Sequence, residues 1–599
     1  MKFESKLRAL AVVPVVLFHA KITGFDGGFV GVDIFFVTSG FLITGIISEE
    51  LQQGNFRLSK FYERRVRRIL PALFFMMIIC GPFAYLWMLP DELENFGQSF
   101  VATAFSANNI LLTLTSNYWD LASEFKPLIH TWSLAVEEQY YFAFHLIMMG
   151  IWKRGRSSVL YILTTIFGIS LSFAIVVHMF SLNQLASSAV FYLPPTRIWE
   201  LLLGAMAAMV FSSGRLKPSR GFVEILGILG LVLISVSVIL FDKSLPSPSA
   251  YTLVPTIGAT LIILFADVRS AAGRLLSWGP LVWIGLISYS LYLWHQPLFA
   301  FLRIYSREEP GTWQMAGAIL VTVCLSALSW RYVEQPFRKS GVVSRGAVLG
   351  SSLLIGLALV LVGFTLHRSQ GFPSRLYAAD VIQPNALNIS YNESVFRFKK
   401  DNFEEGGKTR VLVLGNSFAR DFINMMSETF PIEAIEIAYR DDFGDCLGIL
   451  ESSDLGLLYR NADAIVIASG GASDDCIATD IAMTDLAEKS LYYIGTKQFG
   501  YNMNWLIRLP FNQRGVQCND ILEVTLNQEE WMKNRIPAAN FISLLAPTRQ
   551  GDRIPFTDAN GRLLSPDRTH LTKYGAIFFG DRALRSSSLS ELFGVGIQD

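Results

Sequence analysis

The chain has 599 residues, of which 51% are hydrophobic and only 17% are charged, and its mean hydropathy is +0.38. This composition is too apolar for a soluble protein of this length, and it indicates a polytopic membrane protein with a soluble part attached. The formal net charge is zero, so charge gives no support to a nucleic-acid partner. The five cysteines show no metal-ligand spacing, and we expect no metal site.

Apolar segments with the length of membrane spans recur through the first two thirds of the chain. Eleven are predicted: 7–22, 29–48, 69–89, 132–152, 158–179, 197–212, 222–241, 250–266, 281–303, 313–332 and 347–366. Another apolar segment, 98–114, contains the pair Asn108–Asn109, and we expect it to be interfacial or re-entrant. Basic residues concentrate in alternate loops, so the positive-inside rule places the N-terminus in the cytoplasm. Eleven spans then place everything after residue 366 outside the cytoplasm.

Several ionisable residues lie in or beside these spans, where charge is costly and usually marks a pathway or a reaction site. Arg8 and His19 are eleven residues apart, so on a helix they share a face about 16 Å apart. Near the outer end of its span, the His19 imidazole suits the general base for a hydroxyl. The alternative is a histidine satisfied inside the helix bundle. Asp33 enters the second span at a similar depth and could simply cap that helix.

A basic cluster precedes the third span on the predicted inner face. It contains Arg64, Arg65 and Arg68. Arg64 and Arg68 share a helix face, and guanidinium groups suit phosphates, so we predict that the cluster binds the phosphates of an acyl-coenzyme A. The alternative is that the basic residues are a stop signal that orients the third span. One loop could have both roles, phosphate binding and orientation of the span.

Six motifs appear in a family order across residues 1–340. They are Arg8 with His19, GGFVGVDIFFVTSGFLIT, RRVRRILP, HTWSLAVEEQYY, SYSLYLWHQP and EQPFRK. Together they resemble the membrane acyltransferase-3 family. The resemblance implies transfer of acyl groups, usually acetyl, from acetyl-CoA to hydroxyls of extracytoplasmic carbohydrates. It also favours functional roles for Arg8 and Glu137, and it implies a bacterial inner membrane protein.

The last third of the chain changes character. Residues 368–407 show no sustained periodicity and are predicted to form a periplasmic linker or lid. Beyond them, the β-rich runs TRVLVLG, IEAIEIAY and ADAIVIASG alternate with helical patterns such as AMTDLAEKSLYYIG, which predicts a parallel α/β domain. The expected organisation is a membrane domain (1–340), an eleventh transmembrane helix (341–367), the linker (368–407) and an exported α/β domain (408–599). Export would permit one disulfide among Cys446, Cys476 and Cys518, leaving one thiol.

Two fragments at opposite ends of this α/β domain predict a nucleophilic serine. The run RVLVLGNSFARD reads as a strand, a tight turn and Ser417 at the start of a helix, where free N–H groups favour an oxyanion. The run SPDRTHLTKYGA holds Asp567 and His570, spaced so that one loop can offer both to Ser417. Ser417 would be the nucleophile, His570 the general base and Asp567 the group that orients the imidazole. The alternative is an ordinary strand-to-helix turn and a surface histidine.

These two fragments resemble the first and last blocks of the SGNH (GDSL-like) hydrolase family, over about residues 408–590. The resemblance implies a three-layer α/β fold and an oxyanion hole made by the Ser417 N–H, a glycine N–H and an asparagine side chain. Gly444 is the candidate glycine. The family's GxND block falls at SGGASDD (469–475), which has no asparagine, so the third donor is a backbone N–H near Gly471, or Asn502 or Asn504.

The two resemblances together predict an O-acetyltransferase of the O-antigen type in the inner membrane. It would use cytoplasmic acetyl-CoA and modify a cell-surface polysaccharide such as lipopolysaccharide O-antigen. Transfer through Ser417 and direct transfer assisted by His19 both remain open at this point. Two other functions also remain: a transporter of acyl or lipid-linked compounds with a separate esterase, and a membrane-tethered polysaccharide deacetylase.

Overall fold

The computed structural model divides the chain into two compact units. It describes residues 2–593 apart from 116–122, 181–183, 215–217, 340, 378–388, 405, 432, 434, 443–446, 448–454, 471–473 and 487. The membrane unit comprises Met1–Met88, Glu92–Ile304 and Pro310–Gly371. The C-terminal unit comprises Leu89–Asp91, Tyr305–Glu309 and Phe372–Asp599. We describe each unit by itself.

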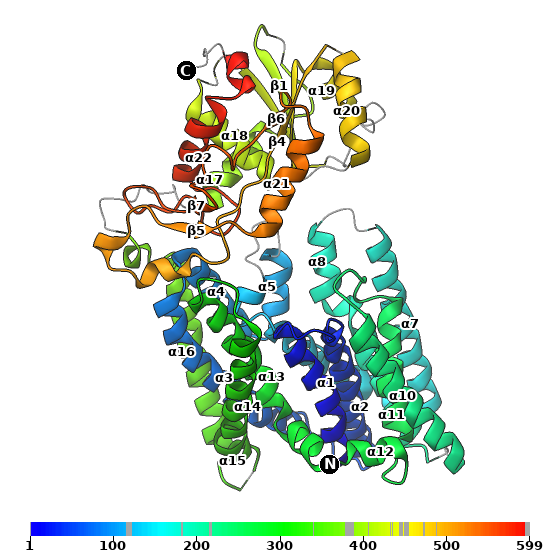
Figure 1. The fold of residues 1–599 in the computed structure, drawn as a ribbon. Helices are drawn as coiled ribbons and strands as arrows, with labels where there is room; N and C mark the ends of the chain where they lie inside the picture. The colour runs from blue at the N-terminus through cyan, green and yellow to red at the C-terminus, as the bar shows by residue number, and fades with distance from the viewer. Residues whose placement is uncertain are drawn as a thin grey trace. The chain divides into compact units, whose positions relative to one another are not determined.

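The membrane unit is built from helices, and every segment predicted as a span coincides with one (Figure 1). These helices are α1 (Lys2–His19), α2 (Gly31–Gln52), α3 (Leu58–Trp87), α6 (Thr131–Ile151), α7 (Arg156–Phe180), α9 (Ile198–Phe211), α10 (Arg220–Leu240), α11 (Leu253–Phe265), α13 (Gly279–Tyr305), α14 (Thr312–Ser329) and α16 (Arg345–Arg368). Shorter helices join them: α8 (Gln184–Tyr192), α12 (Ala271–Leu276) and α15 (Gln335–Arg338).

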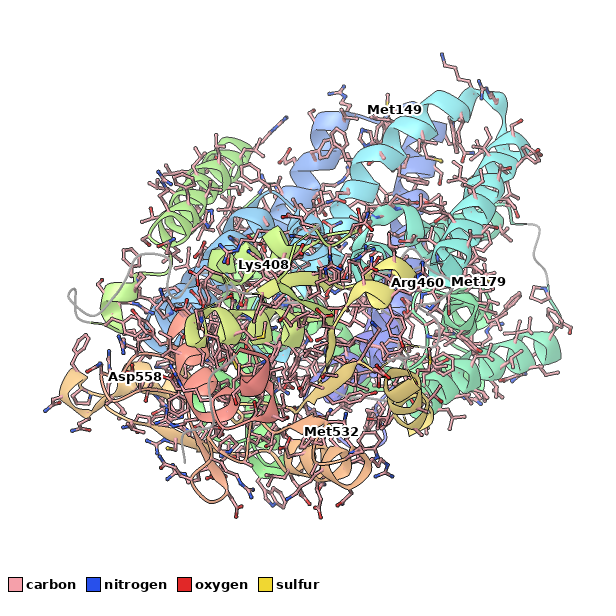
Figure 2. All side chains as sticks on the ribbon, turned by 90° about the horizontal axis from the view of Figure 1, so that it is seen from above. Met149, Met179, Lys408, Arg460, Met532 and Asp558 are labelled. Atoms are coloured by element: carbon pink, nitrogen blue, oxygen red, sulfur yellow. The ribbon has the colours of Figure 1, made fainter. Side chains whose placement is uncertain are left out.

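Length and hydropathy qualify six helices of the described chain as able to cross a membrane, and three shorter apolar helices accompany them. Large apolar side chains point away from the unit. Met149 on α6 and Met179 on α7 project outward (Figure 2), with 46% and 75% of their surfaces exposed. On α16, Leu353, Leu354 and Leu361 are equally exposed. Such a surface is stable against lipid rather than water, so the unit is a multi-pass membrane domain.

The segment 98–114 forms two short helices instead of one continuous span. Helix α4 (Pro90–Ala104) ends at a bend where Ser106 has a φ of +52°, and α5 (Asn108–Thr115) begins directly after it. The fully buried Asn108 amide donates to the Leu128 carbonyl at 3.0 Å and to Thr131 Oγ1 at 2.9 Å. The paired asparagines therefore hold the second short helix to the bundle. Its predicted depth, interfacial or re-entrant, stays a prediction.

Helices α2 and α9 pack backbone against backbone. A Cβ added at Gly40 would lie 1.9 Å from the Leu201 carbonyl oxygen, and one at Gly204 would lie 1.9 Å from the Val37 carbonyl oxygen. Small residues at membrane-helix contacts permit this close approach. The α2 and α9 backbones therefore leave no room for a side chain at Gly40 or Gly204.

The C-terminal unit contains a five-stranded parallel sheet in the order β2-β1-β3-β4-β6. The strands are β1 (Thr409–Gly415), β2 (Ile435–Arg440), β3 (Ala464–Ala468), β4 (Ser490–Ile494) and β6 (Phe541–Ile542). The helices are α17 (Ile389–Glu393), α18 (Ser417–Thr429), α19 (Gly456–Asn461), α20 (Asp474–Leu486), α21 (Glu523–Arg535) and α22 (Lys573–Phe579). A small antiparallel sheet pairs β5 (Cys518–Asp520) with β7 (Arg553–Pro555).

Helices cover both faces of the parallel sheet. Along β1, Val411 and Val413 face a core that includes α18 and α22, while Leu412 and Leu414 face a second core that includes α19 and α21. Because successive strand residues point to opposite faces, an unbroken apolar strand is what a sheet buried on both sides requires. The predicted parallel α/β architecture is confirmed.

Two details of the predicted organisation differ. The pattern AMTDLAEKSLYYIG is helical only in its first part, because α20 ends at Leu486 and Ser490–Ile494 forms β4. Its last residues are buried, and β-branched and aromatic residues suit a strand between β3 and β6. Within the predicted linker, Tyr377 and Val395 are buried in the core of the C-terminal unit. Residues 378–388 lie outside the described residues.

Of the three cysteines in the C-terminal unit, Cys476 is disulfide-bonded and Cys518 is a free thiol. Cys446 lies outside the described residues.

We expect Gly40→Ala to lower the thermal stability of the membrane unit strongly, because the new methyl group has no space between α2 and α9. Gly45→Ala is the matched control on the same helix, since nothing lies within 4 Å of its added Cβ. The measurement is the temperature at which the detergent-solubilised protein loses its monodisperse elution profile. Equal midpoints for the two variants would contradict the close packing.

Candidate active sites

Ser417, His570 and Asp567 form a hydrogen-bonded chain in the C-terminal unit. His570 Nε2 lies 2.9 Å from Ser417 Oγ, and His570 Nδ1 lies 2.5 Å from Asp567 Oδ2. A carboxylate only accepts, so Nδ1 carries the proton and Nε2 presents its lone pair to the serine hydroxyl. This is the arrangement that activates a serine nucleophile. The structure brings together the three residues predicted from opposite ends of the domain.

The serine is placed by the turn between β1 and α18. Gly415 has a φ of +135°, and a Cβ there would lie 2.2 Å from the Ala468 carbonyl oxygen, so only glycine fits. Asn416 caps the helix: its side-chain oxygen accepts from the Phe418 N–H at 3.1 Å, and its amide donates to the Ser469 carbonyl at 2.8 Å. Ser417 is therefore the first residue of α18, where backbone N–H groups have no helical acceptor and favour negative charge.

Asp567 is held as an anion by its own loop. Its Oδ1 accepts from the backbone N–H groups of Thr569 at 2.7 Å and His570 at 2.9 Å. Burial by itself raises the pKa of this carboxyl, but the adjacent His570 imidazole and these hydrogen bonds outweigh burial and leave the pKa below its ordinary value. A carboxylate that stays ionised stabilises the imidazolium formed when His570 takes a proton.

Behind this chain lies a fully buried ion pair that the sequence analysis did not identify. Lys497 Nζ is 2.8 Å from Asp421 Oδ2, and both side chains have no exposed surface. The same lysine donates to the Thr569 carbonyl at 2.5 Å, and Asp421 Oδ1 accepts from the Leu571 N–H at 3.2 Å. The pair thus binds the backbone on both sides of His570 and positions the imidazole. Asp421 follows Ser417 by one helical turn, which is the only signal in the sequence.

The oxyanion donors predicted beside Ser417 are only partly described. Gly444 and Gly471 lie outside the described residues. Asn502 uses its amide elsewhere in the unit, donating to the Ser306 carbonyl at 2.5 Å, and its side-chain oxygen accepts from Asn504. Among the described groups, the N-terminus of α18 is the donor nearest in sequence to the reacting oxygen.

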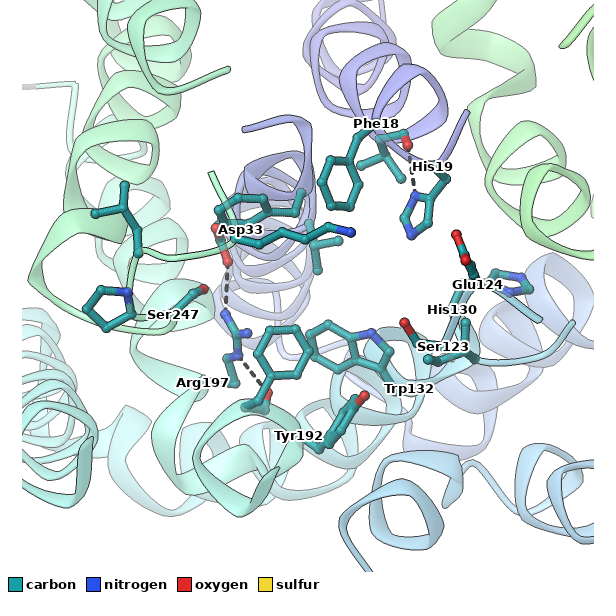
Figure 3. Close-up of a pocket in the computed structure, with 18 of the residues that line it drawn as sticks. Phe18, His19, Asp33, Ser123, Glu124, His130, Trp132, Tyr192, Arg197 and Ser247 are labelled. Atoms are coloured by element: carbon teal, nitrogen blue, oxygen red, sulfur yellow. Dashed lines mark hydrogen bonds and ion pairs between the residues drawn. The ribbon is translucent and has the colours of Figure 1, made fainter. Parts of the chain in front are cut away.

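A second candidate site is a cavity of about 520 Å³ in the membrane unit (Figure 3). His19, at the end of α1, lines it. His19 Nδ1 lies 2.8 Å from the Val15 carbonyl oxygen, which only accepts, so Nδ1 carries the proton and Nε2 keeps its lone pair. Arg303 holds the backbone at this point by donating to the His19 carbonyl at 2.6 Å. The predicted general base therefore has the tautomer that the role requires.

Asp33 lines the same cavity, and its role differs from the cap considered above. It lies in the first turn of α2 but makes no side-chain cap. Its Oδ1 instead binds Arg197 at 3.0 Å, and Arg197 also binds Glu200 at 3.1 Å; all three are buried. The Arg197 guanidinium lies 5.2 Å from the Trp132 ring centre. The sequence analysis missed Arg197 and Glu200. An arginine and a glutamate three residues apart in an apolar segment could have indicated a buried ion pair.

The predicted donor-binding residues separate into different environments. Arg64 is bound by Glu50, at 2.8 and 3.1 Å. Arg65 is buried, with its guanidinium 5.8 Å from the Tyr141 ring centre. Arg68 makes no hydrogen bond or ion pair with any other residue in the described part of the chain, and so keeps its donors available.

Glu137 lies within electrostatic reach of two predicted arginines, Arg8 and Arg68. Its carboxylate accepts from Ser39 Oγ at 3.0 Å and from the Tyr141 hydroxyl at 2.8 Å. The structure therefore groups Arg8, Arg68 and Glu137, which are distant in sequence. The described residues contain no group of three or more metal-ligating side chains.

The acyltransferase domain family matches residues 7–331, which is more than half of the chain. The chain belongs to this family. The membrane unit, including the cavity and the arginine cluster, coincides with the matched region, so the resemblance of the motifs is confirmed. No match was found among solved structures.

The similar proteins include several that are named as O-acetyltransferases. The peptidoglycan O-acetyltransferase OatA of Listeria monocytogenes is 31% identical over 349 residues, which are 56% of this chain and 56% of that protein. The O-acetyltransferase OatA of Staphylococcus aureus (strain NCTC 8325) is 32% identical over 356 residues, 56% of this chain and 57% of that protein. The chain thus spans about half the length of these two relatives. A protein of S. aureus (strain COL), provisionally named an O-acetyltransferase, is 26% identical over 528 residues, 82% of this chain and 86% of that protein.

We expect Ser417 to react covalently with a fluorophosphonate probe, because His570 activates its hydroxyl. Ser417→Ala abolishes labelling, and Asp567→Asn slows it about ten-thousandfold, since the amide no longer orients and stabilises the imidazolium. The measurement is the labelling rate of the purified full-length protein, followed by peptide mass spectrometry. Unchanged labelling of the Ser417→Ala protein would place the reactive serine elsewhere.

We expect Lys497→Met to destabilise the protein by about 3–5 kcal/mol, because it leaves the Asp421 charge buried without a partner. Lys399→Met is the matched control: Lys399 pairs with Asp441 at the surface, and its removal costs at most about 1 kcal/mol. Denaturant unfolding of the full-length variants measures both. In the double variant Lys497→Met/Asp421→Leu much of the loss returns; strictly additive losses would argue against a coupled pair.

Proposed function

We propose that the chain is an O-acetyltransferase that moves an acetyl group from cytoplasmic acetyl-CoA to hydroxyls of a cell-surface polysaccharide. The observation that carries the proposal is the His19 imidazole in a cavity of an acyltransferase-family membrane unit, with its Nε2 lone pair available.

The donor end of the site is the arginine cluster at the start of α3. The substrate acetyl-CoA carries several phosphate oxygens. These oxygens accept hydrogen bonds, and a guanidinium group can donate two to one phosphate. Arg68, with no ion-pair partner in the described chain, supplies the main contact, and the buried Arg65 supports it. Arg64 contributes less, because Glu50 already occupies its guanidinium.

His19 acts as the general base at the acyl group. Its Nε2 takes the proton of the attacking hydroxyl while the hydroxyl oxygen bonds to the acyl carbon. The carbon–sulfur bond of the thioester then breaks, and the proton passes from His19 to the departing sulfur. An ester and a free thiol result, and His19 returns to its starting form.

The C-terminal unit provides an acyl carrier. Ser417 Oγ bonds to the acyl carbon of the ester formed at the membrane site, and His570 takes the serine proton and passes it to the alcohol oxygen that departs. A sugar hydroxyl then attacks the Ser417 ester; His570 takes the proton of this hydroxyl and returns it to Ser417 Oγ as the sugar ester leaves. The parallel sheet order and the serine–histidine–aspartate chain support an SGNH-like domain for this step. The N-terminus of α18 stabilises each oxyanion.

We place the C-terminal unit outside the cytoplasm. The distribution of basic loops along the sequence supports this orientation, and so does the disulfide of Cys476, since disulfides persist in oxidising compartments. The acetyl group is then taken from one side of the inner membrane and delivered on the other.

For the acceptor, we propose lipopolysaccharide O-antigen, the polysaccharide that the sequence motifs suggest. Peptidoglycan is the second candidate, and the name of the Listeria relative favours it. Both present sugar hydroxyls to the same chemistry, so fractionation of the modified polymer separates them.

We expect His19→Ala and Ser417→Ala each to reduce base-labile acetate on the surface polysaccharide to background, because each removes a group of the transfer path. The measurement is mass and NMR analysis of separated O-antigen and peptidoglycan from cells with and without the chain. Full acetylation with either variant would exclude that residue from the path. A net loss of acetate on expression would instead support a deacetylase.

A further inference from the structure

A second imidazole faces the cavity that contains His19. His130 precedes α6, is only 3% exposed and lines the cavity (Figure 3). Neither of its ring nitrogens makes a hydrogen bond to any other described residue. The carbonyl groups of Pro127 and Leu293 are near the ring, but neither has the geometry of a hydrogen bond with a ring nitrogen.

The protein holds this ring in place without using its nitrogens. The Tyr292 hydroxyl donates to the His130 backbone carbonyl at 2.7 Å and lies 2.6 Å from Ser133 Oγ. The His130 ring packs edge-on against Tyr292 and against His295, with ring centres 5.4 Å apart in both cases. An aromatic frame therefore fixes the imidazole, and both ring nitrogens are buried without a hydrogen-bond partner among the described residues.

His19 and His130 differ in which atoms they offer. His19 donates its Nδ1 proton to the Val15 carbonyl and offers a lone pair at Nε2. His130 has no carboxylate hydrogen-bonded to it among the described residues, so burial keeps it neutral, with one N–H and one lone pair. A buried N–H without an acceptor is unfavourable, and an oxygen in the cavity would satisfy it.

We infer that His130 is a second catalytic residue of the membrane site: its ring N–H binds the acyl carbonyl oxygen in the cavity and stabilises the oxyanion of the transition state. The inference rests on the proposed acyl transfer. A neutral imidazole is an established form of such an electrophilic donor.

The chemistry balances without any change in His130. As the hydroxyl oxygen bonds to the acyl carbon, its proton goes to His19 Nε2 and the carbonyl oxygen gains charge. The His130 N–H keeps its proton and donates a hydrogen bond to that oxygen. When the carbon–sulfur bond breaks, the carbonyl re-forms and the thiol leaves with the proton from His19.

Two substitutions of His130 that keep a side chain of similar size distinguish a role as hydrogen-bond donor from a role in packing. His130→Gln keeps an N–H donor, and His130→Phe keeps a ring against Tyr292 but has no donor. Removal of one oxyanion donor typically costs about a hundredfold to a thousandfold in rate. We therefore expect His130→Phe to slow acetylation about a hundredfold and His130→Gln to retain about a tenth of the wild-type rate.

The measurement is the initial incorporation of radiolabelled acetate into base-labile esters of surface polysaccharide, in cells that express the full chain. Immunoblots of isolated membranes normalise for the amount of each variant. His145→Phe, which replaces another buried histidine on α6 away from the cavity, reports the general cost of losing a buried imidazole.

A His130→Phe rate within about threefold of the His130→Gln rate would overturn the inference, because the donor would then be irrelevant to a step that typically loses a hundredfold. The His19→Ala variant is measured in parallel. If it acetylates normally, the proposed function of the membrane site fails; if it is inactive while His130→Phe is active, only the role of His130 fails.

Discussion

The ion pairs of the buried Arg197 guanidinium are the interactions on which the packing of the membrane unit depends. Arg197, which directly precedes α9, joins Asp33 on α2 to Glu200 on α9. The same two helices approach closely at Gly40 and Gly204. Removing one member of such a group leaves an uncompensated charge in an apolar surrounding, which is strongly destabilising. Because Arg197 also lies against Trp132 and lines the cavity, the helix pair and the wall of the candidate site depend on the same ion group.

The C-terminal unit also contains a buried ion pair that connects distant segments of the chain. Lys497 and Asp421 are fully buried together, and they bind the backbone next to His570 rather than the imidazole itself. In both units a buried group of opposite charges lies beside a candidate site without including the groups proposed to react. The cost of burying charge is accepted at these positions because each pair connects segments that are far apart in the chain.

The two candidate bases, His19 and His570, have the same tautomer but differ in how strongly their imidazolium forms are stabilised. Both histidines donate the Nδ1 proton and leave Nε2 as the base, but the acceptor is a backbone carbonyl for His19 and a carboxylate for His570. A carboxylate stabilises the imidazolium more than a carbonyl does. In the proposed reaction, the stronger arrangement would serve a serine hydroxyl and the weaker one a thioester, whose carbon is the better electrophile.

Local patterns in the sequence determined which segments are helices and strands, and they located Ser417 after a strand and His570 beside Asp567. These features depend on neighbouring residues, through hydrophobic periodicity, glycine at a positive φ and the short loop between aspartate and histidine. The strand Ser490–Ile494 was misassigned because the helical pattern before it was extended too far, and only its pairing with β3 and β6 marks where the strand begins. The partner of Asp33 is 164 residues away, and the cavity that includes His19 and His130 draws on several helices. Only the tertiary structure decided these contacts, because hydrogen bonds and ion pairs between distant segments leave no periodic trace in a single sequence.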